Sequence, residues 1–321
     1  MIHAHRHHSK LALFTFTLAF FVILLGAFTR LTDAGLSCPD WPNCFGYITA
    51  PHTNTQLQDA QLQYPMVAVN VKKAWTEMTH RYFAGTEGIL ILMLSLSMLF
   101  SAQTRNLKST CIAILLMGLV LVQIMLGMLT VTEKLKPVIV LSHLLTGLSI
   151  LSVLWWVILD LHYRQTPRLT ERENPGLTRW ICLAFMLVAG QIALGGWVST
   201  HYAGLACVDF PYCNGQILPS IQWNQLNSDL ISIHMLHRIG ALITATYLSI
   251  LSLFLLKNKT FRLFAIAIFS LLCLQITLGI LNIVWLRPVW IALIHQAVGI
   301  LLLLTVIATL VKSSFASRKS A

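Results

Sequence analysis

The sequence predicts an all-α integral membrane protein of eight transmembrane helices, arranged as two tandem four-helix bundles related by a pseudo-two-fold axis along the membrane normal. Three observations lead to this fold class: the apolar composition, eight separate apolar runs and an internal repeat. Of the 321 residues, 56% are hydrophobic and 10% are charged, whereas a soluble domain carries roughly 25% charged residues. The chain therefore lacks the polar surface that would cover a soluble protein of this size.

Eight apolar runs are long enough to cross a bilayer, which takes about 20 helical residues. They occupy residues 11–31, 82–101, 109–131, 138–160, 180–200, 231–256, 263–284 and 291–311. Four runs fall in each half, and an even number of spans returns the chain to the same side of the membrane. The two halves are therefore expected to share one orientation. The first run is too long for the apolar core of a signal peptide, so we expect it to remain as a span.

The basic residues gather between particular spans. A net charge of +11 would suggest a nucleic-acid partner for a soluble protein, but membrane topology explains it better here, and we expect no nucleic acid. With the N-terminus inside, the inner segments hold 14 of the 22 basic residues: Arg6, Lys10, Arg105, Lys108, Arg164, Arg168, Arg172, Arg179, Lys257, Lys259, Arg262, Lys312, Arg318 and Lys319. The long segments 32–80 and 201–230 hold few. The positive-inside rule thus predicts that both termini are cytoplasmic and that both long loops lie outside. We expect a multi-pass protein of a bacterial inner membrane.

An internal repeat relates the two halves. Residues 26–46 read GAFTRLTDAGLSCPDWPNCFG, and residues 195–215 read GGWVSTHYAGLACVDFPYCNG. Further along, Met78-Thr79-His80-Arg81 matches Met235-Leu236-His237-Arg238, Gln123-Ile124 matches Gln275-Ile276, and His143 matches His295. Repetition of this kind in a membrane protein indicates a duplicated bundle.

The repeat and the charge pattern together divide the chain into five segments. We predict a cytoplasmic tail at 1–10, an N-terminal four-helix half at 11–160, a cytoplasmic linker at 161–179, a C-terminal four-helix half at 180–311 and a cytoplasmic tail at 312–321. Pro167 and Pro175 in the linker break helices.

The four repeated histidines are the main candidate ligands. His80, His143, His237 and His295 fall near the outer starts of the second, fourth, sixth and eighth spans. A lone histidine at such a place is usually an interfacial hydrogen-bonding residue, but two per half on alternate helices suit the two faces of a haem iron. Zinc would require three or four converging ligands, which two histidines per half do not provide.

Acidic and basic neighbours distinguish the first half. Glu77 shares a helix face with His80, and the position that matches Glu77 in the second half is His234. By itself Glu77 also fits an interfacial carboxylate near a helix N-terminus. Glu87, deeper in the span, is expected to be a hydrogen-bonded core carboxylate. Arginines beside the histidines, Arg81 among them, suit either haem propionates or the interface.

The seven cysteines fall into two groups. Two pairs share the pattern C-x-D-[WF]-P-x-C in the long outer segments, and the space outside the membrane permits disulfides. We therefore predict the disulfides Cys38–Cys44 and Cys207–Cys213. Both could be structural staples, and a redox role is plausible for the first, which lies in the half with Glu77. The others are expected to be core residues: Cys111, Cys182 and Cys273.

At this point the chain resembles a known family, the haem A synthases, over nearly its whole length. The resemblance rests on TRLTDAGLSCPDWPNCFG at 29–46, EMTHR at 77–81, LSHLLTG at 141–147, HMLHR at 234–238 and IHQAVG at 294–299. It implies a membrane oxidoreductase that oxidises a ring methyl of haem O to a formyl group, through a hydroxylated intermediate, to give haem A for cytochrome oxidase.

The resemblance also implies residue roles and partners. His80 and His143 would face the substrate haem O, and His237 and His295 would hold a prosthetic haem B. Glu77 would be a catalytic carboxylate, with the disulfide pair of the first loop, Cys38 and Cys44, linked to activity. The expected partners are a farnesyl-transferring haem O synthase, assembly factors of cytochrome oxidase and an electron-transfer partner. The electron acceptor and any homo-oligomer are not specified by the sequence.

Two other functions fit the same histidines. One is a di-haem b-type electron carrier, which requires neither the cysteine pairs nor Glu77 and predicts haems at two depths. The other is a haem transporter, which predicts one labile haem and no turnover.

Overall fold

The computed structural model describes residues 2–101, 106–165 and 175–317, and in these ranges the regular structure is helical. The α-helices are α1 (Ile2–Leu31), α2 (Asn54–Gln63), α3 (Val71–Phe100), α4 (Leu107–Thr132), α5 (Pro137–Gln165), α6 (Pro175–Thr200), α7 (Leu230–Leu256), α8 (Arg262–Val284) and α9 (Val289–Ser317). Two short 3₁₀ turns, η1 (Ala203–Leu205) and η2 (Trp223–Gln225), lie in the connection between α6 and α7. The all-helical part of the predicted fold class is confirmed.

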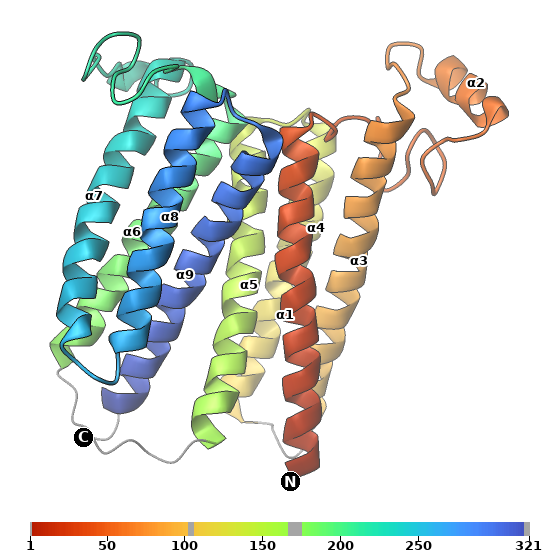
Figure 1. Cartoon of the computed structure of the whole chain (residues 1–321). Coiled ribbons are helices and arrows are strands. Elements are labelled where there is room, and N and C mark those ends of the chain that lie inside the picture. The colour runs from red at the N-terminus through yellow and green to blue at the C-terminus, as the bar shows by residue number, and fades with distance from the viewer. Residues whose placement is uncertain (1, 102–105, 166–174, 318–321) are drawn as a thin grey trace. The chain divides into compact units, whose positions relative to one another are not determined.

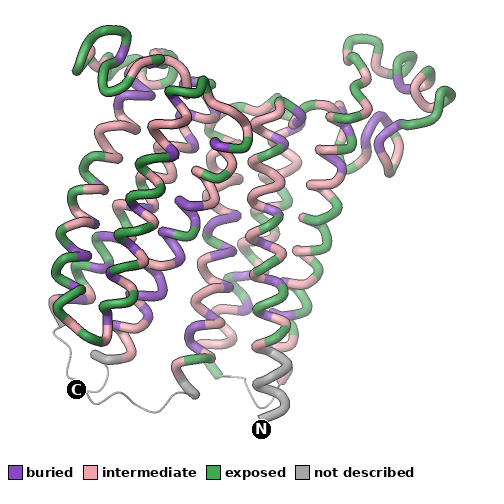
Figure 2. The backbone as a smooth tube through the Cα atoms, in the orientation of Figure 1, coloured by how far each residue is buried: buried purple, intermediate pink, exposed green. Residues whose placement is uncertain are grey.

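Among the described helices, all except α2 are long and apolar enough to cross a membrane, which gives the eight predicted spans. Their outer faces expose large apolar side chains, such as Phe14 at 60%, Leu121 at 69% and Leu242 at 69%. Figure 2 shows exposed residues along the length of the helices rather than only at their ends. Such surfaces are unfavourable in water and favourable in lipid, and the chain is therefore a multi-pass membrane protein.

The helices fall into two compact units, one ending at Leu154 and the other beginning at Trp155 (Figure 1). In the first unit, α3 packs against α1 and α4, and Gly147 of α5 lies against Gln123 of α4 and Ile23 of α1. In the second unit, α6 packs against α7, α7 against α8, α8 against α9 and α9 against α6, which closes a ring. Each unit therefore surrounds an interior of its own.

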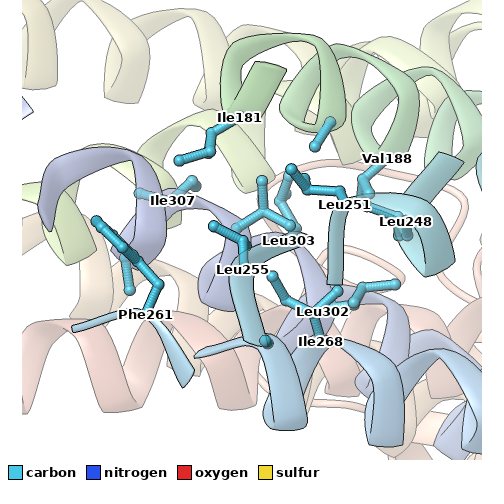
Figure 3. Packing of buried hydrophobic residues seen from close by; sticks show 14 of the residues in the cluster. Ile181, Val188, Leu248, Leu251, Leu255, Phe261, Ile268, Leu302, Leu303 and Ile307 are labelled. Atoms are coloured by element: carbon cyan, nitrogen blue, oxygen red, sulfur yellow. The ribbon is translucent and has the colours of Figure 1, made fainter. Parts of the chain in front are cut away.

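The apolar core of the second unit packs side chains of α6, α7, α8 and α9 together (Figure 3), and its α7 residues lie in the half of that helix that ends at Leu256. It is centred on Ile181, Val188, Leu248, Leu251, Leu255, Phe261, Ile268, Leu302, Leu303 and Ile307. Leu248 follows His237 on α7 by about 16 Å of helical rise. The tightly packed end and the histidine-bearing end of this bundle are therefore separate.

Several helix boundaries differ from the sequence-based expectation. Helix α6 begins at Pro175, which was expected to break a helix in the linker, and α9 continues to Ser317 inside the predicted C-terminal tail. Helix α3 begins at Val71 rather than at residue 82, because Asn70 caps it by accepting a hydrogen bond from the N–H of Lys73 (3.1 Å). Charged residues in its first turns hide this extension from a hydropathy pattern. Helix α2 was not predicted and begins at a capping box formed by Thr53 and Gln56. Helix α1 begins at Ile2, inside the predicted tail 1–10.

Some predictions fall on residues outside the described ranges. They are the inner-side residues Arg105, Arg168, Arg172, Arg318 and Lys319 and the helix breaker Pro167.

Candidate functional site

The four repeated histidines come from four long helices, two in each unit. His80 lies on α3 and His143 on α5, whereas His237 lies on α7 and His295 on α9. Each is within about three turns of the N-terminus of its helix. The two rings of each pair are near enough to interact electrostatically, His80 with His143 and His237 with His295. Each unit thus brings two imidazoles toward one interior.

A glycine on a neighbouring helix faces each of these rings. A Cβ atom built on the glycine would lie close to Cε1 of the ring: 2.9 Å for Gly26 and His80, 3.3 Å for Gly127 and His143, 3.1 Å for Gly195 and His237, and 3.3 Å for Gly279 and His295. Real Cβ contacts are rarely this short, so the glycines make room for the rings. The sequence analysis missed this role, although the repeat of Gly26 at Gly195 and of Gly127 at Gly279 was a usable signal.

The hydrogen bonding of the rings fits haem iron as a partner. Within the described residues, the buried Nδ1 atoms of His80, His143 and His295 have no hydrogen-bond partner, while Nδ1 of His237 lies 3.0 Å from Nε2 of Gln191. Buried polar atoms are normally satisfied, so these rings have unused coordination or hydrogen-bonding capacity. The described residues contain no group of three or more His, Cys, Asp or Glu that could hold a metal ion alone. Two imidazoles per unit suit an iron already held by a macrocycle.

Glu77 ties the first disulfide loop to α3. Its side chain is 4% exposed, and Oε2 accepts hydrogen bonds from the backbone N–H groups of Ser37 and Cys38, both at 2.9 Å. Its other oxygen, Oε1, pairs with Arg81 at 2.6 Å. Both oxygens of this carboxylate are therefore occupied by protein donors. Glu77, three residues before His80 on α3, thus anchors the loop.

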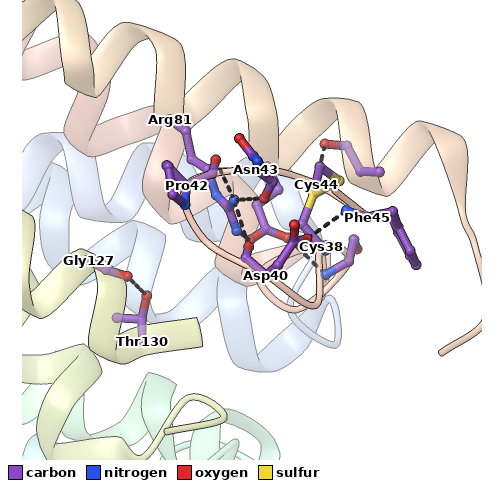
Figure 4. A network of polar contacts seen from close by, with 12 residues as sticks. Cys38, Asp40, Pro42, Asn43, Cys44, Phe45, Arg81, Gly127 and Thr130 are labelled. Carbon is purple, nitrogen blue, oxygen red and sulfur yellow. Dashed lines mark hydrogen bonds and ion pairs between the residues drawn. A yellow bond between two sulfur atoms is a disulfide. The ribbon is translucent and has the colours of Figure 1, made fainter. Parts of the chain in front are cut away.

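Arg81 binds backbone carbonyl groups of the same loop (Figure 4). Its Nη1 donates to the backbone carbonyls of Asp40 (3.0 Å), Pro42 (3.1 Å) and Asn43 (2.6 Å). The sequence suggested haem propionates or the membrane interface as partners for Arg81, whereas the structure shows loop carbonyls. Together with Glu77 it forms a clamp, which we call the Glu77–Arg81 clamp.

The second disulfide loop is held by a related arrangement without the carboxylate. Arg238 donates to the carbonyls of Tyr212 (2.8 Å), Asp209 (3.0 Å) and, more weakly, Cys207 (3.4 Å). His234 takes the place of Glu77, and its Nδ1 lies 2.8 Å from the carbonyl oxygen of Ala203. The loop of the second unit is thus fixed mainly through neutral backbone acceptors.

Each loop also folds around an aspartate. Asp40 accepts hydrogen bonds from the N–H groups of Phe45 (2.6 Å) and Gly46 (2.8 Å). In the second loop, Asp209 accepts hydrogen bonds from the N–H groups of Asn214 (2.6 Å) and Gly215 (2.9 Å). The N–H of Gly215 above all, with that of Asn214, holds the pKa of Asp209 below its ordinary value, although desolvation opposes this.

Both predicted disulfides are present, with sulfur–sulfur distances of 2.07 Å for Cys38–Cys44 and 2.04 Å for Cys207–Cys213. All four half-cystines are buried under their loops. The remaining three cysteines were expected in the core and this was wrong, because all are exposed on the surfaces of their spans: Cys111, Cys182 and Cys273. A thiol is small and apolar enough to face lipid.

Glu87 lies further along α3 and is half-buried. The sequence analysis expected a hydrogen-bonded core carboxylate, but no described residue forms a hydrogen bond or ion pair with it. A carboxylate placed in a span without such a partner is costly and usually functional.

Comparisons with known proteins cover nearly the whole chain. The family model described as "Cytochrome oxidase assembly protein" (COX15-CtaA) matches residues 9–307. A protein named "Heme A synthase" from Shewanella oneidensis is 38% identical over 313 residues, covering 91% of this chain and 92% of that protein. Two further proteins of that name are each 26% identical: one from Neorickettsia sennetsu, covering 88% and 91% of the two chains, and one from Granulibacter bethesdensis, covering 95% and 87%. The similarity therefore extends across both units.

Proposed function

The chain belongs to the COX15-CtaA family of cytochrome oxidase assembly proteins, and we propose that it oxidises haem O to haem A for a cytochrome oxidase. The observation that carries the proposal is the 38% identity to a protein named "Heme A synthase" over 91% of the chain. The reaction class is oxidation at carbon: converting a ring methyl to a formyl group adds one oxygen atom and removes four electrons, through a hydroxylated intermediate. The electron acceptor is a separate partner.

The two units are proposed to bind different haems. In the first unit His80 and His143 would take haem O, and in the second His237 and His295 would hold haem B. Bound haem supplies the redox chemistry, and the protein positions it and excludes water. The unsatisfied Nδ1 atoms of His80, His143 and His295 support these three as ligands, and the repeat supports His237 as the fourth. The second unit lacks carboxylates at the positions of Glu77 and Glu87, which supports a reactive site in the first.

Glu77 and the first disulfide are proposed to act together in catalysis. Glu77 is joined to the N–H of Cys38 directly and to the rest of the loop through Arg81. We infer that Cys38 and Cys44 must be linked for the loop to cover the substrate and that Glu77 sets the position of that cover. The disulfide between Cys207 and Cys213 is proposed to be structural.

The membrane arrangement follows from the charge pattern. We place the protein in a bacterial inner membrane with both termini in the cytoplasm, so that the disulfide loops face the oxidising side. The two units are proposed to be related by a pseudo-two-fold axis along the membrane normal, as the repeat suggests. A haem O synthase is the expected source of substrate, since haem O is too insoluble to diffuse freely.

The function is tested in a membrane host that makes haem O but no haem A. After expression of the full chain, extracted haems are identified by mass. We expect haem A or its hydroxylated precursor. Haem B alone, with haem O demonstrably present in the host, would contradict the proposal and favour an electron carrier. Haem O bound but unchanged would favour a transporter.

A further inference from the structure

One stripe of α3 faces the interior of the first unit. Residues spaced alternately three and four apart share a helix face, and the stripe consists of Glu77, His80, Ala84, Glu87, Ile91, Leu94 and Met98. Its outer end is closed by Glu77 at 4% exposure and its inner end by Ile91 and Leu94 at 1% each. The three residues between these ends are only half-buried. This middle stretch is therefore less enclosed by protein side chains than either end of the stripe.

The same stripe recurs 157 positions later on α7 of the second unit (80 to 237). It consists of His234, His237, Ala241, Thr244, Leu248, Leu251 and Leu255. The apolar positions and the histidine ligand match, but Glu87 is replaced by Thr244, which is only 6% exposed. A carboxyl group at this position of the stripe thus occurs in the first unit but not in the second. The packing of such a stripe therefore does not require one.

Glu87 needs a partner that the described protein does not supply. A carboxyl group inside a membrane span is costly unless it is paired or hydrogen-bonded, and such groups usually mark functional sites. Because Glu87 shares the helix face of His80 and lies seven positions further inward, its partner is expected to belong to the molecule that His80 binds. The separation along the helix is about 10 Å.

We propose that Glu87 accepts a hydrogen bond from the alkyl hydroxyl group of haem O and thereby selects haem O over haem B. This rests on the proposed function, in which the first unit takes the substrate. Haem O carries a hydroxyethylfarnesyl chain where haem B has a vinyl group, on the edge of the porphyrin opposite its two propionates. The charged propionates favour the aqueous loop end of the bundle, so the hydroxyl group lies on the inner side, toward Glu87.

The chemistry of the two groups matches in either protonation state. An ionised carboxylate accepts from a hydroxyl group, and a protonated one retains an acceptor oxygen. The side chain of a helical residue also leans toward the N-terminus of its helix, here toward His80. A site built to hydrogen-bond a substrate hydroxyl discriminates strongly against an analogue without it, because the protein group is then left unpaired. Haem B, which lacks the hydroxyl group, would leave Glu87 without a hydrogen-bond partner.

The test measures which haem the protein retains rather than whether it reacts. Full-length wild type, Glu87→Leu, Glu87→Ala and Glu87→Gln are expressed in a host that makes both haem O and haem B, and the purified proteins are extracted. Thr86→Val is the matched control, since Thr86 is the adjacent residue and is exposed. We count haem A and its precursor together with haem O, so that turnover does not distort the ratio.

We expect the ratio of haem O type to haem B to fall at least tenfold in Glu87→Leu and Glu87→Ala. Glu87→Gln, which keeps an acceptor oxygen, and Thr86→Val should retain the wild-type ratio. If the Glu87→Leu protein does not accumulate in the membrane, Glu87→Ala alone provides the test. An unchanged ratio in both apolar variants would overturn the inference.

A failure of the underlying function looks different. His80→Ala is expected to lose the haem O type. If wild type retains no haem O type, or if His80→Ala retains as much as wild type, the substrate assignment itself is wrong, and the inference falls with it.

Discussion

Glu77 uses both of its carboxylate oxygens at once, so an amide of the same shape is not expected to replace it. Oε2 receives two backbone N–H groups and Oε1 receives Arg81. An amide of the same size has one acceptor oxygen, and its NH₂ group would face either the backbone donors or the guanidinium. One side of the Glu77–Arg81 clamp would therefore open.

We expect Glu77→Gln to retain haem but to lower haem A formation at least tenfold. The physical reason is that the histidine ligands stay in place while the loop above them loses its anchor. Extracted haems from the haem O-producing host give both quantities. Glu133→Gln is the control, since Glu133 pairs with Lys136 on the short connection between α4 and α5. A normal yield of haem A from Glu77→Gln would show that Glu77 has no part in the reaction.

The glycines opposite the histidines give a second prediction at this scale. In Gly26→Ala the new Cβ would lie 2.9 Å from the ring of His80, and in Gly195→Ala 3.1 Å from that of His237. Overpacking of this kind costs about 1–3 kcal/mol, which is roughly a 5- to 150-fold loss of affinity. We expect Gly26→Ala to lose haem O and Gly195→Ala to lose haem B, measured as haem retained per chain.

Gly118→Ala is the control for both substitutions, because a Cβ at that glycine of α4 meets nothing within 4 Å. It should retain both haems. Equal losses from Gly118→Ala would mean that membrane helices of this protein tolerate no alanine for glycine, and the ring contacts would not be the cause.

At the scale of elements, the two disulfide loops share a sequence pattern but are anchored differently. The first is bound through a buried carboxylate next to a proposed substrate ligand, and the second through an imidazole and backbone carbonyls. Each disulfide closes a short loop, since its cysteines are six positions apart. Closure of so short a loop contributes about 2 kcal/mol in the chain-entropy model.

The paired serine variants should therefore separate the two roles. We expect Cys38→Ser/Cys44→Ser to lose most haem A formation. Cys207→Ser/Cys213→Ser should keep activity at low temperature but should unfold at a temperature several degrees below that of the wild type. Product yield and thermal unfolding of the purified proteins check both. Loss of activity in the second variant at temperatures where it remains folded would show that both loops serve the reaction.

The second loop should also respond to acid. Because its backbone hydrogen bonds lower the pKa of Asp209 in the folded state, this carboxylate stabilises the loop above its ordinary pKa near 3.8 and loses that contribution as pH falls through the lowered value. We expect the protection factors of the Asn214 and Gly215 amides, which correct exchange for its intrinsic pH dependence, to fall below about pH 4. Asp209→Asn should exchange faster at neutral pH and show no such step. A step that persists in Asp209→Asn would assign it to another group.

The elements predictable from sequence were those that depend on local pattern. Hydropathy predicted the eight spans, and the repeated C-x-D-[WF]-P-x-C pattern predicted both disulfides. The outer extension of α3 was missed because Lys72, Lys73 and Glu77 interrupt its apolar pattern. The clamp and the ring-facing glycines were missed because their partners lie far away in the chain: Ser37 is 40 residues from Glu77. Periodicity fixes which residues share a face but not what that face meets.

At the scale of the whole molecule, the chain contains two units that each surround their own histidine pair. The pair on α3 and α5 belongs to the first unit, and the pair on α7 and α9 to the second. Each histidine pair comes from one unit only, so each proposed haem would be held by side chains of a single unit. The chain is thus proposed to place a substrate site and a resident cofactor in separate bundles.

This separation predicts that each pair of histidines controls one haem. With haem O supplied, wild type should retain two haems per chain, measured by extraction and mass against protein concentration. His237→Ala/His295→Ala should lose haem B and keep the haem O type, whereas His80→Ala/His143→Ala should do the reverse, because removing both imidazoles leaves iron without a protein ligand on either face. The first variant should still bind substrate, which the retained haem O type would show. If either double variant loses both haems while remaining folded, the two units depend on each other for binding, and a single shared site would replace the two-site interpretation.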